Sequence, residues 1–162
     1  MLKNLLSKQA EAMLNEAVQS ELYASHLYRH LANQLQRLGY FGAQKHFAAE
    51  AADELTHYQK LADLMNDMGT VAKVPMLEAC DERVSSLRDA VEIAYETEMQ
   101  LGMDYQRWFK ACADAPMVQQ ALLPFIEIQR TSIGEYGDLL ARLDLAGDNE
   151  AAILLIDQEM GA

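Results

Sequence analysis

The sequence predicts an all-α protein, a four-helix bundle with one long crossover connection and a short fifth C-terminal helix. Good helix formers such as Ala, Leu, Glu, Gln and Met dominate, and the chain of 162 residues contains only 3 Pro and 8 Gly. Four long segments repeat apolar residues at the spacing of one helix face. Their connections are short, long and short in turn. A chain of this length suits one well-cored domain, so we expect residues 1–162 to form a single domain, with the bundle over about 7–145.

The first half of the chain contains two of the long helices. We predict them over residues 7–38 and 41–68, because Gly39 and Gly69 are natural helix stops. Residues 70–83 follow as the only long connection and show no clean periodicity. A connection of this length lets the second and third helices run parallel, which is the bundle arrangement with one crossover.

The second half contains the other two long helices and the short one. The third is predicted over residues 84–113 and the fourth over 117–145, with Pro116 well placed for its first turn. Pro124 lies inside the fourth segment, where it should bend the helix or mark a ragged early turn. The short helix, at about 149–160, is apolar. We expect it to pack at one end of the bundle or against other subunits.

The charge balance excludes several classes of partner. The net charge is −12, from 13 basic and 25 acidic side chains, so binding to nucleic acid or to an anionic membrane would be repulsive. No apolar run approaches the roughly 20 residues that cross a bilayer. The first residues lack the continuous apolar core of a signal peptide. Cys80 and Cys112 match no close metal-binding pair, and we expect a cytoplasmic protein.

Each apolar stripe is interrupted near its middle by polar residues. Since the helices have similar lengths, these side chains should meet at a similar depth in the bundle. Buried carboxylates are costly, and three together cannot all stay ionised without cations. Carboxylate oxygens with an imidazole and no thiolate suit Fe, Mn or Zn. The interrupting residues are, in helix order, Glu21; Glu54 and His57; Glu98; and Gln129.

The spacing matches most of a known two-metal motif of four-helix bundles. That motif takes a Glu from each of two helices and a Glu-x-x-His from each of the other two. We place one metal among Glu21, Glu54 and His57. Glu54 then bridges to a second metal held by Glu98 and assisted by Gln129. The fourth helix has no histidine three residues after Gln129, so the second position should bind metal more weakly and exchange it more readily.

Several segments resemble the ferritin family, and the non-haem bacterial ferritins most closely. They are LNEAVQSELYASHLY, DELTH, YETEMQ, IEIQ and the C-terminal LDLAGDN…LLIDQEM, and the similarity covers essentially the whole chain. The resemblance implies a ferritin-like bundle that oxidises Fe(II) with O2 or H2O2 at a centre for two irons. It also implies storage of Fe(III) as a hydrated oxide mineral inside a hollow homo-oligomeric shell, expected to have 24 subunits.

The resemblance also implies roles for individual residues. It makes Tyr28 the tyrosine beside the metals and gives Gln129 an assisting role. Leu55 stands where haem-binding relatives have a Met, so no haem is expected. The implied catalytic set is Glu21, Tyr28, Glu54, His57, Glu98 and Gln129, all but the tyrosine also binding metal, with Glu50, Asp53 and Glu127 as accessory metal ligands.

Two other functions remain as alternatives. The first is a soluble di-iron carboxylate oxidase or peroxide scavenger without mineral storage, against which stand the single histidine and the fifth helix. The second is a metal-free helical assembly module whose buried acids pair with Lys or Arg. No basic residue occupies the matching stripe positions, which disfavours this module.

Overall fold

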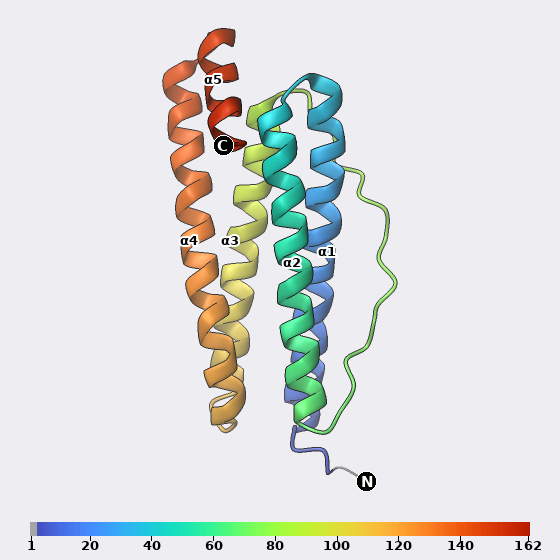
Figure 1. The fold of residues 1–162 in the computed structure, drawn as a ribbon. Coiled ribbons are helices and arrows are strands. Elements are labelled where there is room, and N and C mark those ends of the chain that lie inside the picture. The colour runs from blue at the N-terminus through green and yellow to red at the C-terminus, as the bar shows by residue number, and fades with distance from the viewer. Residues whose placement is uncertain (1–2) are drawn as a thin grey trace.

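Five helices build the part of the chain that the structure, a computed structural model, describes, residues 3–162 (Figure 1). Figure 1 shows α1 and α2 antiparallel, and the crossover running outside α1 so that α2 and α3 point the same way. None of the helices in residues 3–162 has the length and hydropathy that spanning a bilayer requires. The predicted bundle with one crossover and a short fifth helix is confirmed. The helices are α1 Lys8–Leu38, α2 Phe41–Asp67, α3 Leu87–Ala111, α4 Pro116–Ala146 and α5 Glu150–Met160.

Local capping explains where α3 begins. The helix starts at Leu87, later than predicted, because the Ser86 hydroxyl accepts a hydrogen bond from the Asp89 backbone N–H at 3.1 Å. The Asp89 carboxylate in turn accepts from the Ser85 backbone N–H at 2.7 Å. The first bond satisfies one of the N–H groups that a helix start leaves free, and the second holds Ser85 before the N-cap, so both serines lie outside the helix.

Proline positions in α4 follow the prediction in part. Pro116 is the first residue of the helix, where its missing N–H costs nothing. Pro124 lies inside a helix that runs unbroken to Ala146. The helix therefore tolerates the loss of the one backbone hydrogen bond that Pro124 cannot donate.

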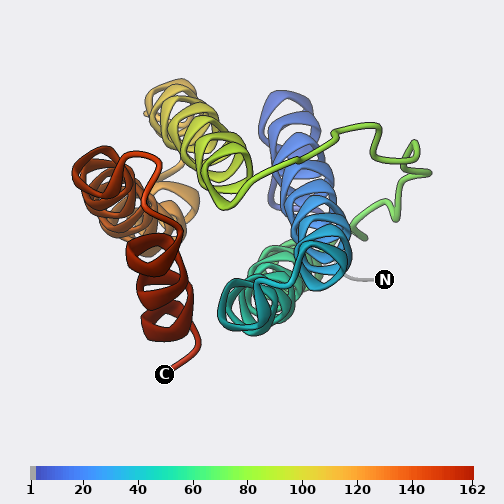
Figure 2. The same ribbon diagram turned by 90° about the horizontal axis from the view of Figure 1, so that it is seen from above.

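The short helix α5 packs against α2 and α4 at one end of the bundle (Figure 2). The α2 N-terminus has no side-chain cap of its own, since Tyr40 makes no such bond. The buried Asp157 carboxylate of α5 instead accepts from Gly42 N at 3.2 Å and from Ala43 N at 2.7 Å. A Cβ on Gly42 would lie 1.7 Å from the Asp157 carbonyl oxygen, so this close approach requires glycine.

Candidate metal centre

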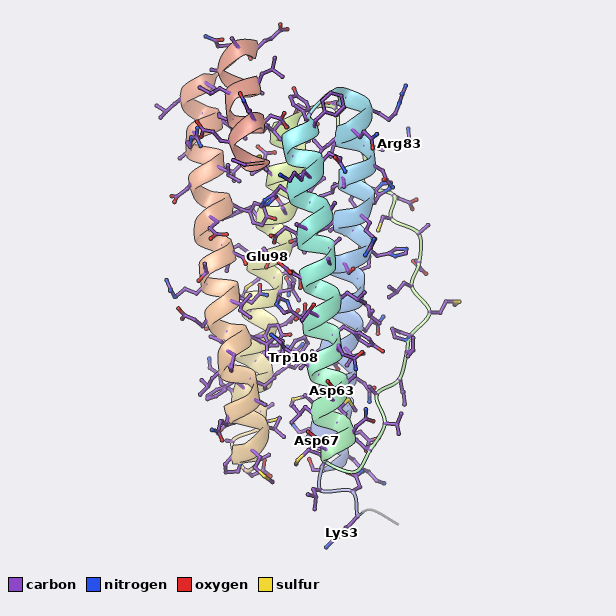
Figure 3. All side chains as sticks on the ribbon, viewed as in Figure 1. Lys3, Asp63, Asp67, Arg83, Glu98 and Trp108 are labelled. Carbon is purple, nitrogen blue, oxygen red and sulfur yellow. The ribbon has the colours of Figure 1, made fainter. Side chains whose placement is uncertain are left out.

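Polar side chains from all four long helices are buried inside the bundle. Glu21 is 0 % exposed, Glu54 3 %, Glu98 1 % and Gln129 1 %. Figure 3 shows Glu98 in the interior, about half-way along the helices. The helical period sets this position, because each residue lies in the apolar stripe that its helix turns toward the core.

Glu21, Glu54 and His57 form one compact group, the Glu21–Glu54–His57 cluster. One ligand atom from each lies within 4.8 Å of the others. His57 Nδ1 is 2.8 Å from Glu54 Oε2 and 3.8 Å from Glu21 Oε2. Glu21 Oε2 is buried and accepts no hydrogen bond. A buried oxygen without a partner is costly, and two carboxylates with an imidazole are a donor set that fits Fe, Mn or Zn.

A proton links Glu54 and His57 in the metal-free protein. Burial alone would lower the pKa of His57, but the carboxylates of Glu21 and Glu54 outweigh it and raise the pKa to about 10. Burial raises the pKa of Glu54 to about 9, helped by Glu21 and opposed by His57. Both pKa values lie above 7, so the metal-free pair is protonated at neutral pH. A metal ion that binds the cluster must displace these protons.

The Glu98 end of the centre is built differently. We assign the Gln129 amide with its nitrogen toward Glu98, because its hydrogen-bond partners require this orientation. The nitrogen then donates to Glu98 Oε2 at 2.6 Å and to the Glu98 backbone oxygen at 3.2 Å. The Tyr28 hydroxyl donates to Glu98 Oε1. Burial raises the pKa of Glu98 to about 7, opposed by the Tyr28 hydrogen bond. This end thus offers one carboxylate and one neutral amide.

A second tyrosine, Tyr105, also touches the centre. Its hydroxyl donates to Glu21 Oε1, and its ring is fully buried. The site residues predicted from the sequence do not include Tyr105. A signal was nevertheless present, because Tyr105 follows Glu98 by seven residues, as Tyr28 follows Glu21. Two helical turns bring such residues back to one face.

A family model described as the ferritin-like domain matches residues 11–146. The chain belongs to the ferritin family. It is 24% identical over 159 residues to a probable bacterial non-heme ferritin-like protein of Haemophilus influenzae, covering 97% of this chain and 96% of that protein. It is 26% identical over 153 residues to the bacterial non-heme ferritin of Escherichia coli, covering 91% and 90%. The resemblance to non-haem bacterial ferritins is confirmed.

The fold of this ferritin is also that of solved structures. It superposes on an open pore ferritin from the archaeon Archaeoglobus fulgidus with a TM-score of 0.93, over 98% of each chain and at 21% identity. At this identity the match establishes the fold alone.

The accessory acids of this ferritin lie in unlike surroundings. Glu50 is half-buried, and burial raises its pKa to about 7, with Asp53 adding to the shift. The positive charge of His57 opposes this shift, so Glu50 lies within electrostatic range of the cluster. Asp53 is exposed, and Glu127 is exposed and paired with Arg130 at 2.5 Å. The structure does not bring Asp53 and Glu127 into the buried centre.

The buried acids of this ferritin have no Lys or Arg partner within residues 3–162. Their ion-pair contacts are those of Glu21 and Glu54 with His57. The Lys and Arg ion pairs of the described chain all involve other, surface acids. A metal-free module would need buried basic partners here, so this arrangement disfavours it.

Proposed function

We propose that this ferritin is a cytoplasmic iron-storage protein with ferroxidase activity. It oxidises Fe(II) with O2 or H2O2 at an intra-subunit centre for two irons. It stores the Fe(III) as a hydrated oxide mineral inside a hollow shell of 24 identical subunits. The observation that carries the proposal is the buried Glu21–Glu54–His57 cluster, whose free Glu21 oxygen lies in the core of a ferritin bundle.

Iron is the substrate of this centre, and its ligands divide between two positions. Glu21, Glu54 and His57 bind the first iron. Glu54 also bridges to the second iron, as in the two-metal bundle motif. Glu98 binds the second iron, with Gln129 beside it. The protons held by Glu54 and His57 leave when the first iron enters. Two Fe(II) give up two electrons in all, which with two protons reduce O2 to H2O2 or H2O2 to water.

The unequal ligand sets support a passage of iron through the centre. Fewer charged ligands at the Glu98 position mean weaker binding of the second iron. Oxidised iron that is held weakly can move on to a mineral store. A net charge of −12 also favours the accumulation of cations around the protein.

The test is anaerobic addition of Fe(II) to the metal-free protein followed by O2, with Fe(III) formation and particle size measured together. We expect fast oxidation of about two irons per chain, as in the two-metal bundle motif, then continued uptake in a large particle. Glu54→Ala should abolish the fast phase because it removes the bridging ligand. Asp53→Ala is the matched control, since Asp53 is an exposed acid on the same helix.

Two outcomes would contradict the proposal. Fast oxidation without mineral in a small particle would favour a soluble di-iron oxidase. Oxidation no faster than in buffer alone would show that the protein has no ferroxidase activity.

A further inference from the structure

Two buried tyrosines make a swapped pair of hydrogen bonds across the candidate metal centre. Tyr28 of α1 donates to Glu98 of α3, whereas Tyr105 of α3 donates to Glu21 of α1. Both tyrosines are 0 % exposed. Each follows the glutamate of its own helix by seven residues and serves the glutamate of the other helix. The same contact is thus made in both directions between α1 and α3.

The ring of Tyr105 is fixed on two sides. Phe125 stacks on it, with ring centroids 5.2 Å apart and an interplanar angle of 8°. Trp108 meets it edge-on, at 5.1 Å and 86°. Trp108 is itself anchored, because its Nε1 donates to Glu16 Oε2 at 3.1 Å. Such packing leaves the hydroxyl little freedom, so the hydrogen bond to Glu21 loses little entropy when it forms.

The contact with Tyr105 decides which oxygen of Glu21 is free. Oε1 accepts from Tyr105, whereas Oε2 accepts no hydrogen bond and lies 3.8 Å from His57 Nδ1. Without the phenol hydroxyl, both oxygens would be free to rotate toward the cluster. Tyr105 therefore presents one defined oxygen beside the imidazole.

We propose that Tyr105 is a positioning residue for the first iron, holding Glu21 so that Oε2 faces the metal beside His57. Tyr28 holds Glu98 in the same way for the second iron, so each tyrosine governs a different metal position. The inference rests on the proposed function, because it takes the cluster to be the first iron site. Outer hydrogen bonds of this kind orient the groups that bind a metal and raise their affinity.

The test is an anaerobic Co(II) titration of the metal-free full-length protein, followed by the visible Co(II) absorption spectrum. Tyr105→Phe removes only the hydroxyl, and it should weaken the tighter binding step by about 10–100-fold and change the spectrum of the first Co(II). Tyr28→Phe should leave that step unchanged and weaken the second one.

Tyr136→Phe is the matched control. Tyr136 is also buried, at 2 % exposed, but its hydroxyl contacts His46 Nε2 at 3.3 Å and no carboxylate of the centre. Loss of the Tyr136 hydroxyl should leave both Co(II) affinities unchanged.

The outcomes separate the inference from the proposed function. If the wild type binds two Co(II) and Tyr105→Phe binds them equally well, the positioning role is wrong while the iron centre stands. The same holds if Tyr136→Phe loses as much affinity as Tyr105→Phe, because the effect would then be a general loss of packing. A wild type that binds no Co(II) would overturn the proposed function itself.

Discussion

The two ends of the candidate metal centre differ although the same helical pattern builds both. The Glu21–Glu54–His57 cluster has two carboxylates and an imidazole within 4.8 Å, and in the metal-free state Glu54 and His57 are protonated at neutral pH. The Glu98 end has one carboxylate, which a Gln129 amide satisfies at 2.6 Å. One end is therefore left needing a cation, while the other is already satisfied by a neutral group. Equal depth in a bundle does not make two positions equal in affinity.

The largest effect should come from neutralising one carboxylate at each end. Glu21→Gln removes a charged ligand proposed for the tighter position, and we expect the metal affinity there to fall about 100-fold, or roughly 2.7 kcal/mol. Glu98→Gln should remove the weaker binding step and leave the tighter one nearly unchanged. Anaerobic Fe(II) calorimetry measures both steps. Two variants with the same binding curve would show that the ends are not distinct.

The stability of the metal-free protein should depend on pH through Glu98. Because the pKa of Glu98 is raised from 4.5 to about 7 on folding, the folded state holds a proton that the unfolded state releases. Stability from this group is thus present at low pH and is lost as the pH rises from about 4.5 to about 7.

Denaturant unfolding with chelator present at pH 5 and pH 8 measures this loss. We expect Glu98 to account for about 2 kcal/mol of the decrease in unfolding free energy between the two pH values. The unfolding free energy of Glu98→Gln should therefore decrease by about 2 kcal/mol less than that of the wild type. An identical decrease in both proteins would show that Glu98 keeps an ordinary pKa.

A carboxylate added to the weaker end should make the two ends more alike. Gln129→Glu places a second carboxylate beside Glu98, so the affinity of the weaker step should rise about tenfold, or roughly 1.4 kcal/mol. The same variant should destabilise the metal-free protein, since the side chain at this position is only 1 % exposed. Fe(II) titration and denaturant unfolding test the two effects. If the affinity of the weaker binding step does not increase, residue 129 lies away from the metal.

The smallest effect should come from the exposed acids outside the centre. Asp53→Asn and Glu127→Gln remove charges in solvent, and Glu127 is paired there with Arg130. Surface pairs contribute little, so we expect both Fe(II) binding steps to change less than about twofold. A larger loss in either variant would make that acid an iron ligand after all.

The residues that the sequence predicted are those whose type conflicts with their surroundings. Glu21, Glu54 and Glu98 stand out because a carboxylate in an apolar stripe needs a reason. Tyr105 was missed because a tyrosine suits an apolar stripe, and only its hydroxyl shows the link to Glu21. Long helices were predictable from periodicity, whereas the start of α3 depended on the cap at Ser86.

The contact of Asp157 with α2 was beyond sequence reasoning. Asp157 and Ala43 are 114 residues apart, and an acid near the end of an amphipathic helix usually lies in solvent. Only the folded chain shows that a carboxylate from α5 takes the place of a local cap.

Because Asp157 caps α2, the order in which the helices are synthesised affects the structure of the nascent chain. The ribosome completes α2 long before it adds α5, so on the nascent chain the first amides of α2 lack the Asp157 carboxylate that later binds them. Gly42 keeps the space open for it, since any side chain there would collide with α5. The N-terminal turn of α2 is thus completed only after α5 has been made, and a chain interrupted before α5 lacks these two hydrogen bonds.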